Sequence, residues 1–199
     1  MVEHNEGSNA LEVGCTAATS IAQVLQASDL LYLDSVDVEW FRYGIGHTGY
    51  RSRILHCREL TAAALADRVR GSQPVSRPEA HPETLLLLGP GNWITSDGSR
   101  RGEPELVSVS VDVADEDTMV ELSVHHDIWA ENGFFGRPHP EVHDGNAPRL
   151  ARALRALEVM LGSETEKGEA TYFGTAFHYG VAAPRGGSEM TGLDVTDRR

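Results

Sequence analysis

Hydrophobic and polar residues alternate strictly in the middle of the chain, where residues 107–113 read VSVSVDV. A repeat of two places successive side chains on opposite faces of a β-strand. This segment therefore predicts a strand with one buried and one solvated face. A polar turn over 114–117 is followed by a second alternating segment, VELSVH at 120–125. The two segments together predict a β-hairpin.

A helical pattern follows further along the chain. Four leucines fall on one narrow stripe of an α-helix: Leu150, Leu154, Leu157 and Leu161. Asn146 is a favourable N-cap residue and Gly162 is a common helix stop, so the pattern predicts a helix over 147–161. Shorter periodic segments predict two further helices, over 21–32 and 60–70.

The remaining apolar segments are short and bounded by turn residues, which is typical of strands. Such segments lie at 36–43, 50–57, 84–88, 92–96 and 170–181. Together with the hairpin they predict an α+β fold, a mostly antiparallel sheet of about seven strands with about three helices packed on it. The chain ends are polar and aperiodic, so we expect flexible tails at 1–15 and 184–199 around a single domain at 16–183.

The composition favours a folded cytoplasmic protein. Hydrophobic residues make up 40% of the 199 positions, which is enough for one domain with a sizeable core. No apolar stretch approaches the roughly 18 residues that span a bilayer, and the N-terminus lacks the apolar region of a secretory signal. Cys15 and Cys57 make no disulfide framework, which favours a reduced, cytoplasmic setting.

Acidic side chains outnumber basic ones by 30 to 17, which gives a formal charge of −13. Few cations are available to displace the counterions of a phosphate backbone, so we expect no nucleic-acid partner. An acidic surface favours a basic protein partner attracted by long-range electrostatics, with plain solubility as the ordinary alternative. Lys167 is the only lysine, and this preference for arginine indicates a GC-rich bacterial genome.

A candidate metal site lies where the return strand of the hairpin runs into a histidine-rich loop. His125 and Asp127 both face solvent if the strand continues, with His126 tucked inward. A His-x-Asp pair supplies two ligands for iron(II) or zinc, and His178 or His143 would supply the third. The ordinary alternative is a hydrogen-bonded core histidine beside a surface loop.

Two other patterns have ordinary explanations. Residues 44–49 read GIGHTG, the glycine spacing of dinucleotide-binding loops, but a strand rather than a helix is expected directly after them. The glycines therefore predict a hairpin turn. Arg149, Arg152 and Arg155 lie opposite the leucine stripe and predict a solvated helix face, with an anion site as the alternative.

Two functions from different classes remain. The first is a binding protein, an acidic cytoplasmic bacterial protein of the inhibitor or immunity type that acts against a basic toxin or nuclease. It rests on the net charge and on the lack of a recognisable catalytic motif. The alternative is a small metal-dependent enzyme that uses His125, Asp127 and a distal histidine with iron(II) or zinc.

Overall fold

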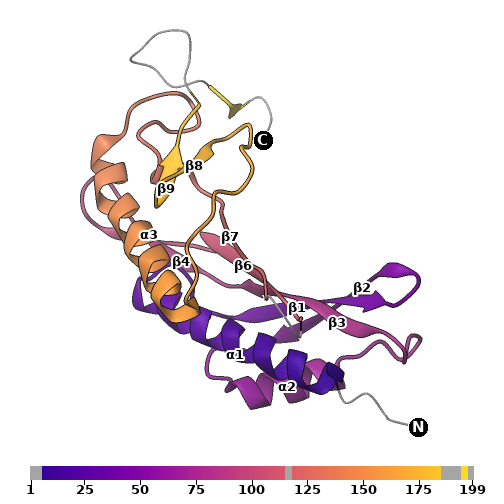
Figure 1. Ribbon diagram of the computed structural model, residues 1–199. Helices are drawn as coiled ribbons and strands as arrows, with labels where there is room; N and C mark the ends of the chain where they lie inside the picture. The colour runs from indigo at the N-terminus through magenta and orange to yellow at the C-terminus, as the bar shows by residue number, and fades with distance from the viewer. Residues whose placement is uncertain (1–5, 115–117, 185–193, 197–199) are drawn as a thin grey trace.

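The computed structural model describes residues 6–114, 118–184 and 194–196 (Figure 1). The helices are α1 (Glu6–Ala27), α2 (Ala62–Gly71) and α3 (Pro140–Leu161), with one 3₁₀ turn, η1 (Asp127–Trp129). The strands are β1 (Ser35–Arg42), β2 (Gly46–Leu55), β3 (His81–Leu88), β4 (Gly91–Ile94), β5 (Arg100–Glu103), β6 (Val107–Asp112), β7 (Val120–Val124), β8 (Thr175–Phe177) and β9 (Gly180–Ala182). The predicted α+β class is confirmed. None of the helices in these residues is long and apolar enough to cross a bilayer.

Five strands form one antiparallel sheet in the order β2-β1-β3-β6-β7. The predicted hairpin is present as β6 and β7, with Val107 paired to Val124 and Val111 to Val120. Val107, Val109 and Val111 are fully buried, which confirms the face predicted from the alternating pattern. A slip of one residue would expose these valines, so burial fixes the register.

One face of this sheet carries helices α1 and α2 (Figure 1). Alternate strand residues point toward them and share one hydrophobic core with helix side chains. The core includes Val36, Val38, Trp40, Leu85 and Leu87 from the strands and Cys15, Ile21, Leu25, Leu65 and Val69 from the helices. The residues between these strand positions point to the opposite face. That face is mostly polar and includes Asp37, Glu39, Thr84, Ser110 and Asp112, beside Leu86 and Leu88.

The first helix is longer than the sequence predicted. We expected a helix over 21–32 and a flexible tail over 1–15, but α1 spans Glu6–Ala27, so the tail prediction is wrong from Glu6 onward and the predicted helix end lies beyond the observed one. Among the described side chains of α1, four of the seven buried hydrophobic ones are small; the seven are Ala10, Leu11, Cys15, Ala18, Ile21, Ala22 and Leu25. Small side chains let the helix approach the sheet closely. They also give a weak hydrophobic signal, and for this reason the pattern was missed.

Helix α3 also begins earlier than its predicted start at residue 147. Gly145 lies within α3, and its missing side chain makes room for β4, since a Cβ there would lie 3.2 Å from Ile94 Cγ2. Asn146 was expected to be the N-cap. It is instead buried within α3, and its amide bonds the backbone N–H and carbonyl of Ile94 at 2.8 and 2.7 Å. These contacts with β4 override the local preference of Asn146 for a helix start.

Two small sheets and a terminal segment lie outside the main sheet. β4 pairs with β5, which the sequence did not predict, and β8 pairs with β9 where a single strand over 170–181 was expected. Much of the predicted tail 184–199 lies outside the described residues. In its described part, Val195 is buried and its N–H donates to the carbonyl of Phe134 at 2.8 Å.

Arg149 holds α3 against the segment that follows α1 and against β4. Arg152 and Arg155 are exposed as predicted, whereas Arg149 is partly buried, so the solvated-face prediction is wrong for this residue. Its guanidinium donates to four oxygens: the carbonyls of Ser28 (2.9 Å), Asp29 (3.2 Å) and Asn92 (2.8 Å), and Asn146 Oδ1 (3.0 Å). Burial lowers the pKa of Arg149. One side chain thus satisfies polar groups of three separate segments.

Both cysteines are buried and carry free thiols. Burial and the nearby Glu12 carboxylate raise the pKa of Cys15 to about 12. Burial also raises the pKa of Cys57. Because the thiolate is the reactive form, neither side chain is prepared for nucleophilic chemistry in the folded protein.

Candidate interaction surface on the β1–β2 hairpin

The predicted metal ligands begin where β7 ends. Strand β7 stops at Val124 and η1 begins at Asp127, so the alternation assumed for His125 and Asp127 does not continue. His125 lies beside β6, where its Nε2 is 2.7 Å from Ser108 Oγ and 3.8 Å from Glu105 Oε1. Asp127 instead takes part in the polar contacts of the turn.

The carboxylate of Asp127 organises the loop between β7 and α3. His126 Nδ1 lies 2.8 Å from its Oδ1, and the Phe134 N–H donates to its Oδ2 at 2.9 Å. Burial alone would raise the pKa of Asp127, but the hydrogen bonds from His126 and Phe134 outweigh it and lower the pKa to about 2. Asp127 thus has a structural role in this loop.

The other two predicted ligands, His143 and His178, line a groove between α3 and the β8–β9 hairpin. Its volume is about 520 Å³, and Asp144 and Arg155 also line it. His143 Nδ1 lies 3.3 Å from Asp144 Oδ1. The described residues, which include all four predicted ligands, contain no group of three His, Cys, Asp or Glu side chains that could hold a metal ion. The structure therefore gives no support to the predicted site.

Asp127→Asn should weaken the dependence of stability on acid pH. Since the folded pKa of about 2 lies below the ordinary 3.8, ionised Asp127 stabilises the fold above pH 3.8, and this contribution is lost as pH falls toward 2. We expect the variant to lose about 1–2 kcal/mol at pH 6 and little at pH 2. Urea unfolding from pH 2 to pH 6 measures the difference. A constant difference across this range would contradict the assignment.

The glycine-rich segment 44–49 covers the end of the turn of the β1–β2 hairpin and the first residues of β2. Gly44, Gly46 and Gly49 have φ angles of 79°, 93° and 74°, a backbone conformation that residues with a side chain rarely adopt. The Ile45 N–H donates to the carbonyl of Arg42 at 3.1 Å and closes the turn. Because a strand follows, the hairpin interpretation is confirmed and the helix that a dinucleotide-binding loop requires is absent from this position.

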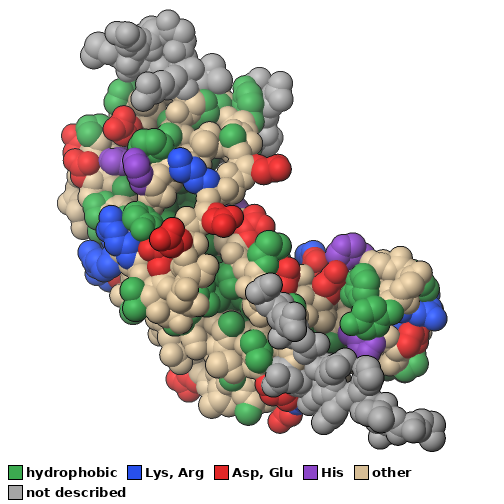
Figure 2. Space-filling view, in the orientation of Figure 1, with side chains coloured by type: hydrophobic (Ala, Val, Ile, Leu, Met, Phe, Trp, Pro, Cys, Tyr) green, Lys and Arg blue, Asp and Glu red, His purple; other side chains and the backbone are tan. Residues whose placement is uncertain are grey.

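The end of this hairpin presents aromatic and apolar side chains to solvent. Tyr43 is 78% exposed and Ile45 is 64% exposed. The ring of Phe41 meets Tyr43 edge-on, with centroids 5.5 Å apart, and the ring of His81 lies 5.4 Å from Tyr43. Figure 2 shows hydrophobic and histidine side chains gathered on this projecting end of the molecule. Sequence alone gave no sign of this exposure. The nearby aromatic residue Trp40 is buried, and the local sequence does not distinguish it from Tyr43.

The linker between α2 and β3 runs beside β2 and extends this surface. Ser72 accepts a hydrogen bond at its carbonyl from Ser52 Oγ at 2.6 Å. Further along, the guanidinium of Arg77 lies 5.9 Å from the ring centre of Tyr50. Between these two contacts Val75 is 98% exposed. We call Phe41, Tyr43, Ile45, His47, Tyr50 and His81 the hairpin surface.

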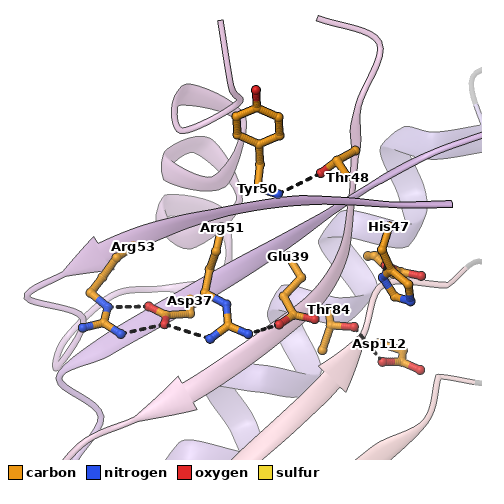
Figure 3. Close-up of polar contacts among 10 residues, drawn as sticks. Asp37, Glu39, His47, Thr48, Tyr50, Arg51, Arg53, Thr84 and Asp112 are labelled. Carbon is orange, nitrogen blue, oxygen red and sulfur yellow. Dashed lines mark hydrogen bonds and ion pairs between the residues drawn. The ribbon is translucent and has the colours of Figure 1, made fainter. Parts of the chain in front are cut away.

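Acidic residues of β1 and arginines of β2 alternate along the polar sheet face (Figure 3). Arg53 donates from Nε and Nη2 to the two oxygens of Asp37, at 2.6 and 2.7 Å. Arg51 pairs with Glu39, and its Nη1 lies 3.9 Å from Asp37. Asp37 is buried, whereas the side chains of Arg51 and Arg53 are 52% and 60% exposed. The arginines thus neutralise a buried carboxylate and remain accessible from the edge of the sheet.

Comparison with known proteins gives no match: no family model, curated protein or solved structure is similar enough to place the chain. The interpretation of the hairpin surface therefore rests on its own geometry.

Proposed function

We propose that the chain is a binding protein and that the hairpin surface is where it recognises a protein partner. The observation that carries this proposal is the exposure of Tyr43 and Ile45 at a projecting turn. Contiguous exposed apolar side chains are uncommon on monomeric proteins and often mark interaction sites. Tyrosine is also enriched among residues that dominate binding energy.

The hairpin presents these side chains with little conformational freedom. The hydrogen bond from the Ile45 N–H to the Arg42 carbonyl closes the turn, and Arg53 and Arg51 brace β2 against the carboxylates of β1. A preorganised surface loses less entropy on association than a flexible loop. This favours recognition over a purely structural role for an exposed turn.

The net charge of −13 led us to expect a basic partner, and an inhibitor or immunity-type role stays a prediction. The exposed cations Arg51 and Arg53 do not favour a basic contact at β2 itself. A basic partner would use acidic parts of the surface beyond the hairpin. The metal-enzyme alternative is not favoured by any contact among the described residues.

A photo-cross-linking residue at position 43 tests the binding function in cells that naturally make the protein. We expect one adduct of defined mass when the cross-linking residue is at position 43. We expect none when it replaces Val159, a matched position on α3 that is 85% exposed. Tyr43→Ser combined with Ile45→Ser should then lower affinity for the captured protein at least tenfold, about 1.4 kcal/mol.

The same double variant supplies the control for folding. Because both side chains are largely exposed, the free energy of unfolding should change by less than about 0.5 kcal/mol. Equal adducts from positions 43 and 159, or unchanged affinity in the folded double variant, would refute the hairpin surface as the recognition site.

A further inference from the structure

We propose that the edge of β2 binds an extended segment of the partner as an added strand, with acidic residues at alternate positions of that segment. This inference rests on the proposed binding function and specifies the partner's chemistry. It concerns the backbone and the arginines of β2, which the hairpin surface does not include.

The backbone of β2 forms one free edge of the main sheet. β2 has ten residues, of which Arg51 to Leu55 pair with β1 in continuous register before a bulge, and within the described part of the chain β1 is its one neighbouring strand. The opposite edge strand, β7, has five residues and ends at the turn formed by η1. An exposed edge presents alternating N–H and C=O groups that an extended peptide satisfies by strand addition.

The charged side chains of β1 and β2 place negative charge inside the sheet and positive charge toward this edge. Negative carboxylates of Asp37 and Glu39 stand on β1, and their arginine partners stand on β2 toward the edge (Figure 3). Arg53 binds Asp37 through Nε and Nη2, which leaves its Nη1 without a protein partner among the described residues. A strand added outside β2 would meet the positive end of each pair. Acidic side chains opposite Arg51 and Arg53 would continue the alternation, because opposite charges on neighbouring strands are stabilising.

The intervening residues of an added strand would face the α2 side of the sheet. The linker after α2 contacts β2 at Ser52 and at Tyr50, and Val75 between these contacts is almost fully exposed. An apolar side chain of the partner is favoured there because it would remove Val75 from water. The partner segment is thus expected to alternate acidic and apolar residues.

A second copy of this chain is a poorer occupant of the same edge. Antiparallel pairing of β2 with itself, centred between Arg51 and Arg53, places arginine opposite arginine. Like charges directly opposite each other destabilise a sheet, and exposed charges on edge strands oppose such self-association.

Synthetic peptides of about ten residues test the proposal, since this length matches the strand. One peptide alternates Glu and Val, a second alternates Lys and Val, and isothermal titration calorimetry of the full chain at low salt gives each affinity. We expect the Glu peptide to bind at least tenfold more tightly than the Lys peptide. Arg51→Gln should weaken the Glu peptide about fivefold, while the matched Arg152→Gln on α3 leaves it unchanged.

Backbone N-methylation distinguishes strand addition from simple charge attraction. Methyl groups on one alternate set of residues block the hydrogen bonds to β2, whereas methyl groups on the other set point away from it. We expect one methylated Glu peptide to lose binding and the other to keep it. Equal loss in both, equal binding of the Glu and Lys peptides, or no binding of the Glu peptide would overturn the strand-addition proposal. The adduct at position 43 is independent of these peptides, so the binding function can survive that failure.

Discussion

Gly91→Ala is expected to lower the free energy of unfolding by about 3–5 kcal/mol, among the largest effects of a single methyl group. A Cβ at this position would lie 2.2 Å from the Leu30 carbonyl oxygen and 2.9 Å from Leu106 Cβ. The carbonyl belongs to backbone, which cannot rotate away as the end of a side chain can. Accommodation requires β4 to move away from the segment that follows α1.

The matched control is Gly71→Ala at the end of α2, where a Cβ would meet nothing within 4 Å. That variant should be unchanged or more stable by up to about 1 kcal/mol, because alanine favours a helix over glycine. Urea unfolding of both variants measures the contrast. Equal stability of the two would mean that β4 does not approach the chain as closely as described.

Arg149→Met is expected to lower the free energy of unfolding by about 3 kcal/mol, because three backbone carbonyls and the side-chain oxygen of Asn146 lose a charged donor in a partly buried setting. Methionine keeps most of the apolar volume of the side chain, so the loss reports mainly on the hydrogen bonds. Arg149→Lys should recover only part of the stability, because a single ammonium cannot reproduce the planar guanidinium geometry.

Arg152→Met provides the control on the same helix, since Arg152 is exposed. Its stability should stay within about 0.5 kcal/mol of the parent chain. Thermal unfolding followed by circular dichroism, with the denaturant series, gives both values. A loss of the same size in both variants would show that Arg149 acts through general helix charge rather than through its carbonyl contacts.

Sequence patterns predicted the helices and strands that bury one face lined by large apolar residues. The valines at 107–113 predicted β6 and its buried face, and the leucine stripe predicted the second half of α3. The first half of α1 was missed because its buried stripe is largely alanine and cysteine. The start of α3 was missed because Gly145 and Asn146 fit inside the helix through their contacts with Ile94. Ile94 is distant in sequence, so the local pattern does not show these contacts.

The candidate site was less accessible to sequence reasoning. The metal prediction assumed that the period of β7 continues through His125 and Asp127, and only the turn at η1 shows that it does not. The glycines at 44–49 correctly indicated a hairpin turn. Nothing local separates buried Trp40 from exposed Tyr43, because their environments are set by α2 and by the length of the hairpin beyond it.

The enclosed thiols of Cys15 and Cys57 have a practical consequence for handling the protein. A maleimide dye attached to a cysteine introduced at position 43 would label that position alone while the chain stays folded, since both native sulfur atoms are shielded. Fluorescence from the turn could then follow partner capture without first removing either natural cysteine.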